Sequence, residues 1–196
     1  MIDIQWQTHT RIKLLQHLID LHNYQHYLEI GCDKNQVFGN ITVGLKEGVD
    51  PNRGGTQRMT SDDFFAQDSR TWDLIFIDGL HTYEQVSRDF DNAFARLNPN
   101  GTVVIHDMLP LTPAQAGPRP VERYWLGDVW RLAFDLSNRS DLNFQLFKFD
   151  FGCGIVTHGA QNSKQLACDG TWDFYQRNYN QLPLTTFEEY FNHASI

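Results

Sequence analysis

The residues with the strongest potential for chemistry follow two apolar segments. Asp78-Gly79-Leu80-His81 comes directly after the run 74–77, and His106-Asp107 follows the mostly apolar run 102–105. Carboxylate and imidazole groups are suitable ligands for a divalent cation. An imidazole also titrates near neutral pH, so His81 could accept a proton from a hydroxyl group. The alternative is that the aspartates cap the following turns and the histidines hydrogen-bond with them. We favour the functional interpretation because the pattern occurs twice.

A second group of residues has the types expected of a nucleoside site. Glu29-Ile30-Gly31 closes a short apolar run, and Asp50 follows about 20 residues later. Glycine permits a tight turn and the close approach of a ligand. A carboxylate can accept hydrogen bonds from both hydroxyls of a ribose. The segment 31–39 lacks the Gly-x-Gly-x-x-Gly pattern that binds a pyrophosphate. A nucleoside without a pyrophosphate is therefore a better prediction than a dinucleotide.

Both groups lie at the ends of predicted strands. The runs 27–30, 74–77 and 102–105 are continuously or mostly apolar, which is typical of parallel strands covered on both faces. A helical stripe over 83–97 separates the last two runs, so this part of the chain predicts a βαβ unit with a right-handed crossover. In an open parallel sheet, ligands bind beyond the carboxyl ends of the strands. The polar residues above follow those ends.

Weaker patterns predict the elements on the N-terminal side of this unit. Helical spacing indicates an amphipathic helix over about 10–22 and a weak helix over 36–44. Asp50 marks the end of a second strand. Ser61, followed by two aspartates, predicts a capped helical turn at 61–65.

On the C-terminal side, we expect a turn at 98–101 and an exposed, proline-bearing loop over 109–123. A helix over 128–136 follows, with Asp128 as its N-cap. The segments 144–149 and 153–157 predict an antiparallel hairpin at the edge of the sheet.

Composition narrows the class of protein. The chain has 196 residues, of which 41% are hydrophobic, which suits one domain over 1–196 with a core at about 27–157 and a C-terminal extension at 158–196. The net charge of −8 argues against a nucleic-acid partner. No apolar run is long enough to cross a membrane, and the start of the chain lacks the features of a signal peptide. Three cysteines without CxxC spacing suit free thiols, so we expect a cytoplasmic protein with no membrane partner.

The motifs resemble those of a known family. The segments DGLHTYEQV and NGTVVIHD are the most specific, and YLEIGC, GVDP and DFGCGIV accompany them. Together they resemble the class I S-adenosylmethionine (SAM)-dependent methyltransferases, more narrowly the small-molecule O-methyltransferase-like proteins of methyltransferase family 24. The resemblance runs from about 27 to 157. It implies an α/β, Rossmann-like methyltransferase fold, in which a mostly parallel seven-stranded sheet with an antiparallel last strand carries helices on both faces.

The resemblance also implies SAM as the cofactor. It places Glu29 and Gly31 at the amino-acid end of SAM and Asp50 at the ribose. It places Ser61 and Asp62, after the third strand, near the adenine.

For the reaction, the resemblance implies that Asp78 follows the fourth strand and borders the methyl-donor pocket, with His81 as the general base. Asp78, His106 and Asp107 would hold Mg²⁺ or another divalent cation. The chain departs from the family where Asp33-Lys34-Asn35 stand in place of a glycine, and where His106 replaces an acid found in some relatives.

We therefore expect SAM-dependent methyl transfer to a hydroxyl oxygen of a small molecule, such as a sugar or another hydroxylated metabolite. Asp78 and His81 are the predicted catalytic residues. The alternative is a catalytically inactive methyltransferase-like domain that binds a ligand or acts as a scaffold. The aromatic tail, with Phe187, Tyr190 and Phe191, could pack on the body of the protein or on a second subunit, which leaves a homo-oligomer open.

Overall fold

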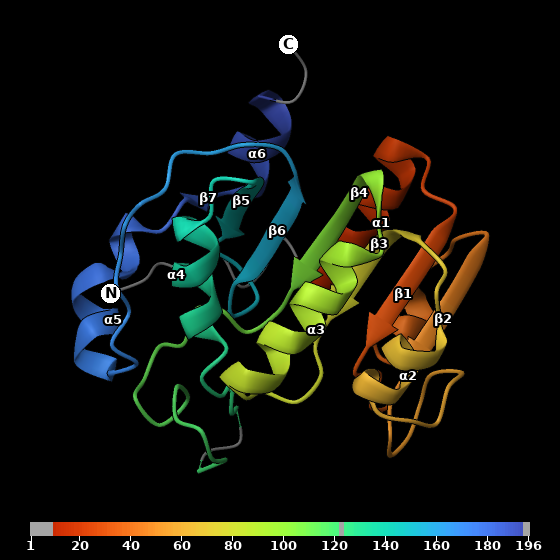
Figure 1. Cartoon of the computed structure of the whole chain (residues 1–196), viewed down its shortest axis with the longest axis horizontal. Coiled ribbons are helices and arrows are strands. Elements are labelled where there is room, and N and C mark those ends of the chain that lie inside the picture. Colours follow the sequence, from red (N-terminus) through yellow and green to blue (C-terminus); the bar gives the residue numbers. More distant parts are fainter. Residues whose placement is uncertain (1–9, 122–123, 194–196) are drawn as a thin grey trace.

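One twisted sheet runs through the molecule (Figure 1). The computed structural model describes residues 10–121 and 124–193, and in these ranges seven strands lie in the order β2-β1-β3-β4-β6-β5-β7. The strands are β1 (His26–Ile30), β2 (Leu45–Val49), β3 (Trp72–Ile77), β4 (Leu97–Ile105), β5 (Leu142–Phe147), β6 (Cys153–His158) and β7 (Leu184–Thr185). Strand β6 is antiparallel to both β4 and β5, and every other pair is parallel. The predicted α/β fold with a mostly parallel seven-stranded sheet is confirmed. The antiparallel strand, β6, is the last strand of the predicted core at about 27–157. Strand β7 comes from the predicted C-terminal extension at 158–196.

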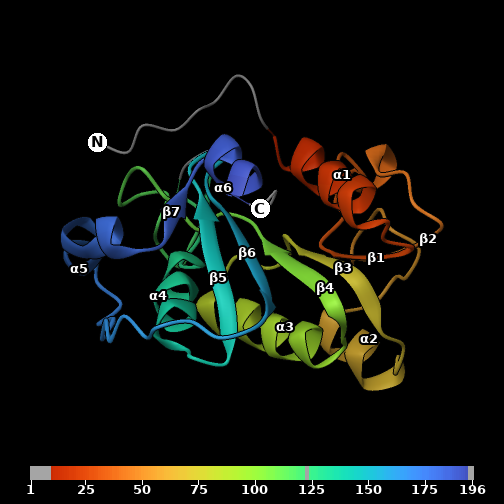
Figure 2. The same cartoon turned by 90° about the horizontal axis from the view of Figure 1, so that it is seen from above.

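Helices cover both faces of the sheet (Figure 2). Helices α1 and α6 lie on one face, and α2, α3 and α4 lie on the other. The helices are α1 (Arg11–His22), α2 (Ser61–Gln67), α3 (Tyr83–Ala95), α4 (Trp130–Asn138), α5 (Trp172–Asn178) and α6 (Phe187–His193). None of the helices in the described ranges is both long and apolar enough to cross a membrane.

Strand β3 shows why its sequence is continuously apolar. Successive side chains of a strand point to opposite faces of the sheet. Leu74 and Phe76 accordingly pack in the cluster that contains the buried residues of α1, whereas Ile75 and Ile77 pack in the cluster that contains Phe90 of α3. Apolar side chains therefore cover both faces of the strand at 74–77.

The βαβ unit aligns the strand ends that carry the site. Ile77 at the end of β3 is paired with Ile105 at the end of β4. The backbone N–H of His106 donates to the carbonyl of Ile77 at 3.0 Å, and the N–H of Asp78 donates to the carbonyl of Ile30 at 2.8 Å. Backbone hydrogen bonds therefore connect the ends of β1, β3 and β4. The polar residues that follow these strands begin side by side at the same edge of the sheet.

Two elements predicted before the C-terminal half of the chain are wrong. The weak helix over 36–44 is reduced to one 3₁₀ turn at Phe38–Asn40. The turn expected at 98–101 belongs to β4, and a register shift in the β3–β4 pairing accommodates the proline there. Asn98 takes part in this irregularity, because its side-chain amide donates to Asp73 Oδ1 at 2.6 Å.

The start of α2 also differs from the prediction. Thr60 is the N-cap, since its hydroxyl accepts a hydrogen bond from the N–H of Asp63 at 3.1 Å, and Ser61 is the first helical residue. The strand implied before it is reduced to a single parallel bridge between Val49 and Gln57. Within the described residues, Asp78 therefore follows the third strand in chain order rather than the fourth.

Further differences concern the C-terminal half. Asp128 does not cap α4. Its Oδ1 accepts a hydrogen bond from the N–H of Tyr83 at 2.7 Å, so it caps α3 from outside that helix. The hairpin of β5 and β6 is not at the edge, because β7 pairs with β5. The loop expected to be exposed begins with buried residues, among them Leu109, and Ala116 is buried within it. Rings of Phe187, Tyr190 and Phe191 in the tail lie against Phe147 of the same chain.

Candidate active site

A cavity of about 540 Å³ opens beyond the carboxyl ends of β1, β2 and β3. This volume is in the range of small-molecule sites. Every residue that the sequence predicted for the cofactor lines it: Glu29, Gly31, Asp50, Ser61, Asp62 and Asp78. His81 also lines the cavity, as do Arg11, Gln85 and Asp89, which the sequence analysis did not select.

Gly31 allows two strand ends to approach each other. Its φ of +87° lies in the left-handed region, and a Cβ at this position would lie 2.1 Å from the carbonyl oxygen of Asp78. A side chain is therefore excluded on two counts. The close approach that this glycine permits is to the backbone of Asp78 and Gly79, which forms the adjoining wall of the cavity.

The loop after β1 adopts left-handed backbone without further glycines. Asp33 has a φ of 42° and Asn35 a φ of 60°, and these are the residue types other than glycine that adopt this region most readily. The side-chain oxygen of Asn35 accepts a hydrogen bond from the N–H of Gly55 at 2.7 Å, and Asp33 pairs with Arg53. The unusual residues thus connect this loop to the segment after β2.

Asp50 joins the same two segments through its carboxylate. Oδ2 accepts hydrogen bonds from the N–H groups of Cys32 at 3.1 Å and Asp33 at 2.9 Å, and Oδ1 accepts from those of Asn52 at 2.8 Å and Arg53 at 2.9 Å. Burial disfavours the charged form, but these four donors outweigh it and lower the pKa of Asp50. A ribose hydroxyl would have to replace some of these bonds to reach the carboxylate.

Glu29 is almost completely buried at the floor of the cavity. Its Oε1 accepts a hydrogen bond from the N–H of Phe38 at 3.2 Å, and its other oxygen accepts from the hydroxyl of Tyr27. Burial raises the pKa of Glu29 to about 7, and the neighbouring charge of Asp78 adds to this effect. A cationic group placed in the cavity would favour the ionised form.

The first turn of α2 is connected to α3 at the far side of the cavity. The side-chain amide of Gln85 donates to Ser61 Oγ at 3.2 Å, to Asp62 Oδ1 at 3.1 Å and to Asp89 Oδ1 at 3.0 Å. Asp89 is 1% exposed, and burial raises its pKa. The helical spacing of Gln85 and Asp89 was visible in the sequence, but not the direction in which that helix face points.

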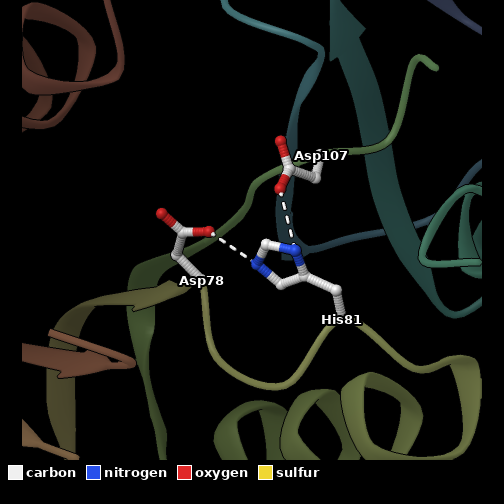
Figure 3. A group of neighbouring side chains, drawn as sticks. All are labelled: Asp78, His81 and Asp107. Carbon is white, nitrogen blue, oxygen red and sulfur yellow. Dashed lines mark ion pairs between the residues drawn. The ribbon is translucent and has the colours of Figure 1, made fainter. Parts of the chain in front are cut away.

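Asp78, His81 and Asp107 form a compact group at the edge of the cavity (Figure 3). His81 lies between the two carboxylates, with Nε2 at 3.4 Å from Asp78 Oδ1 and Nδ1 at 3.3 Å from Asp107 Oδ2. Potential ligand atoms of all three residues lie within 4.8 Å of one another. Nδ1 of His81 also lies 3.0 Å from the carbonyl oxygen of Trp125, which can only accept, so this nitrogen carries a proton and Nε2 is the nitrogen free to exchange one.

The two carboxylates change the acid–base properties of His81. Burial opposes protonation, but the hydrogen bond that His81 donates to Asp78 and the charge of Asp107 raise the pKa of His81 to about 9. Conversely, burial favours the neutral form of Asp78, and the imidazoles of His106 and His81 lower its pKa well below the usual value.

The sequence analysis predicted His106, with Asp78 and Asp107, as a metal ligand. Ligand atoms of the two aspartates also converge with those of His81. Nε2 of His106 donates to the backbone carbonyl of Asp150 at 2.6 Å, and Nδ1 lies 3.0 Å from Asp107 Oδ1 and 3.3 Å from Asp78 Oδ1. Burial opposes protonation, but the charges of Asp107 and Asp78 raise its pKa well above the usual value. Both ring nitrogens of His106 therefore already have partners, and the neighbouring aspartates favour its protonated form.

A mostly parallel sheet with a cavity at its strand ends, lined by acids and a glycine turn, is the arrangement of α/β proteins that bind ligands beyond the carboxyl ends of their strands. A family model described as a methyltransferase domain matches residues 9–108, just over half of the chain. The chain belongs to this methyltransferase family, and it is a class I SAM-dependent methyltransferase. No curated protein sequence gives a significant match.

Solved structures with a similar fold include other methyltransferases. The SAH-bound (S-adenosylhomocysteine-bound) methyltransferase PaMTH1 of Podospora anserina is 13% identical, with a TM-score of 0.55, over 78% of this chain and 80% of that one. The O-methyltransferase TomG of Streptomyces achromogenes, in complex with SAM, is 16% identical, with a TM-score of 0.54, over 76% and 80%. The MycE methyltransferase of mycinamycin biosynthesis, with Mg and SAH, is 15% identical, with a TM-score of 0.51, over 83% of this chain and 53% of that one.

Proposed function

We propose that the protein transfers the methyl group of SAM to a hydroxyl oxygen of a small molecule, such as a sugar or another hydroxylated metabolite. The observation that carries this proposal is the position of His81. Its Nδ1 is bound to a backbone carbonyl, and its Nε2 faces Asp78 Oδ1 at 3.4 Å beside a cavity that also contains the predicted cofactor residues. Solved relatives of this fold include O-methyltransferases, which supports an oxygen acceptor.

In this proposal, SAM lies along the strand ends. Glu29 and Gly31 are next to its amino-acid end, Asp50 is next to the ribose, and Ser61 and Asp62 at the start of α2 are next to the adenine. Asp78 lies between the amino-acid end and His81. The acidic walls suit a cofactor that carries a sulfonium and an ammonium group, because opposite charges attract strongly in a partly desolvated site.

The chemical step is a displacement at the methyl carbon. A bond forms between the acceptor oxygen and the methyl carbon while the bond between that carbon and sulfur breaks, which leaves SAH. The proton of the hydroxyl moves to Nε2 of His81, which acts as the general base. Asp78 orients the ring and is the second predicted catalytic residue. The positive sulfonium would lower the raised pKa of His81 and favour the neutral ring that can accept a proton.

Asp78, His81 and Asp107 are also the residues that would hold a divalent cation, and with a cation bound at Nε2, His81 would act as a ligand instead of as the base. Their ligand atoms converge, and two carboxylates with one imidazole form a suitable donor set for Mg²⁺ or a first-row transition metal. A bound cation would orient the acceptor hydroxyl and lower its pKa. Magnesium in the MycE structure supports this part of the proposal.

Ligand-dependent unfolding tests the cofactor. A ligand that binds the folded state raises the unfolding midpoint. We expect a rise with SAM or SAH at millimolar concentration, none with NAD, and a further rise when Mg²⁺ or Mn²⁺ is added. The absence of any rise with SAM or SAH would contradict the proposal and favour the inactive scaffold.

Methyl transfer itself is tested with methyl-labelled SAM and a panel of sugars and other hydroxylated metabolites. The variant His81→Ala should lower turnover by a factor of about 100 or more, because general-base catalysis contributes that much. Binding of SAH by the same variant should remain nearly unchanged. Equal losses of turnover and SAH binding would contradict the role of His81 as the base.

A further inference from the structure

We propose that Arg11 binds the α-carboxylate of the cofactor's amino-acid end. This inference rests on the proposed SAM site. It adds a binding residue from α1, a helix that the sequence analysis did not connect with the cofactor.

The charges of the cavity make Arg11 stand out. Within the part of the chain that the structure describes, Arg11 is the single lysine or arginine among the residues that line this cavity. The acidic residues on the same walls are Glu29, Asp33, Asp50, Asp62, Asp78 and Asp89. A ligand carboxylate placed elsewhere in this cavity would meet like charges. At Arg11 it meets a guanidinium, which stays protonated and has the planar geometry that matches a carboxylate.

The guanidinium lies where a zwitterion needs it. Nε of Arg11 is 3.7 Å from Asp78 Oδ2, and Glu29 and Gly31 line the same cavity. An amino acid carries its ammonium and carboxylate on one carbon, so its binding groups must also be neighbours. Asp78 and Glu29 can accept from the ammonium group, and Arg11 can donate to the carboxylate beside it.

The protein holds Arg11 in place from a distant turn. Nη1 donates to both carboxylate oxygens of Asp150 at 3.0 Å, and the backbone N–H of Arg11 donates to Asp150 Oδ2 at 2.9 Å. The turn is fixed in a costly conformation, since Asp150 and Phe151, neither of them glycine, both have a positive φ. The N–H of Leu109, shortly after the end of β4, donates to the carbonyl of Phe151 at 2.7 Å. This hydrogen bond holds the turn next to the segment that follows β4.

This arrangement leaves the guanidinium incompletely satisfied. Nε of Arg11 is buried and has no hydrogen-bond acceptor among the described residues. A quarter of the side chain nevertheless remains exposed, and the side chain lines the cavity. Asp150 therefore orients Arg11 while part of its side chain still lines the cavity, where a ligand carboxylate could meet it.

Isothermal titration calorimetry with two ligands tests the inference. SAH carries the carboxylate and the ammonium, whereas decarboxylated SAH lacks the carboxylate alone. The wild-type protein should bind SAH more tightly than the decarboxylated analogue, by about 10- to 100-fold for one charge-assisted pair. This comparison needs no variant, so it remains informative if a substitution at Arg11 prevents folding.

The variant Arg11→Gln should remove most of this preference, lowering SAH affinity about 10- to 100-fold while affinity for the analogue changes little. Arg11→Lys should restore part of the SAH affinity, and Lys13→Gln, in the same helix but not among the cavity residues, should bind like the wild type. The inference is overturned if the wild type does not discriminate between the ligands or if Arg11→Gln weakens both equally. If the wild type binds neither SAH nor its analogue, the SAM site itself is refuted.

Discussion

Glu29 allows a quantitative test of the electrostatics of the cavity. Replacement of this residue by Gln removes the titratable group and keeps the shape of the side chain. The Gln carbonyl can still accept from the N–H of Phe38, and its amide can contact the hydroxyl of Tyr27. The variant therefore isolates the proton equilibrium of one buried carboxyl group.

The magnitude follows from the shift in pKa. Glu29 has a pKa of about 7 in the folded protein against a reference value of 4.5, and each unit is worth about 1.4 kcal/mol. Because the folded state holds the proton more tightly, this carboxyl group stabilises the protein most below pH 4.5, and the contribution is lost as pH rises through 7. The wild type should therefore lose about 3 kcal/mol relative to Glu29→Gln across this window.

Urea unfolding followed by tryptophan fluorescence measures this difference at pH 5, 6, 7 and 8. We expect the free energy of unfolding of Glu29→Gln, minus that of the wild type, to increase steadily up to pH 7 and then level off. Glu84→Gln, which changes an exposed glutamate, is the control for replacing a surface carboxyl group. A flat difference for Glu29→Gln would show that Glu29 is ionised in the folded protein throughout, and would refute the reasoning.

Three further predictions concern neighbouring contacts. Gly31→Ala should destabilise the protein by about 2–4 kcal/mol and abolish the SAH-dependent rise of the unfolding midpoint, because the new Cβ would overlap the carbonyl of Asp78. Thermal unfolding measures both effects. A variant with the wild-type midpoint would contradict this prediction. Asp128→Ala should cost about 1 kcal/mol, since the N-terminus of α3 loses the acceptor for the N–H of Tyr83; urea unfolding checks this, and an unchanged stability would mean that water replaces the cap. Asp107→Asn should abolish the Mn²⁺-dependent rise of the unfolding midpoint while the SAH-dependent rise persists, and a retained metal effect would place the cation elsewhere.

The elements that were predicted correctly are those specified by local patterns. Strand β3 is buried on both faces, so its sequence is continuously apolar, and α3 shows the spacing of a helix with one buried stripe. The failures lie where tertiary contacts override local preference. The Asn-Pro-Asn-Gly segment has the residues of a turn, yet pairing with β3 draws it into β4 through a register shift.

The candidate site was predictable where it depends on topology. Parallel strands bring their carboxyl ends to one edge, so the acids after β1, β2 and β3 had to lie close together. Arg11, Gln85 and Asp89 were missed because they come from helices. The direction in which a helix face points depends on how the helix packs, and this packing is not encoded in the few residues around each side chain.

The different positions of His81 and His106 show what sequence proximity leaves undetermined. Both histidines follow predicted strands and lie within three residues of an aspartate, so the local sequence alone does not show which nitrogens of each ring have backbone partners. The difference comes from groups far along the chain. The carbonyl of Trp125 binds one nitrogen of His81 and leaves the other at the cavity, whereas the carbonyl of Asp150 binds the second nitrogen of His106 and commits the ring. Since the turn that supplies Asp150 also holds Arg11, one segment contacts both the buried His106 and the guanidinium at the proposed cofactor site.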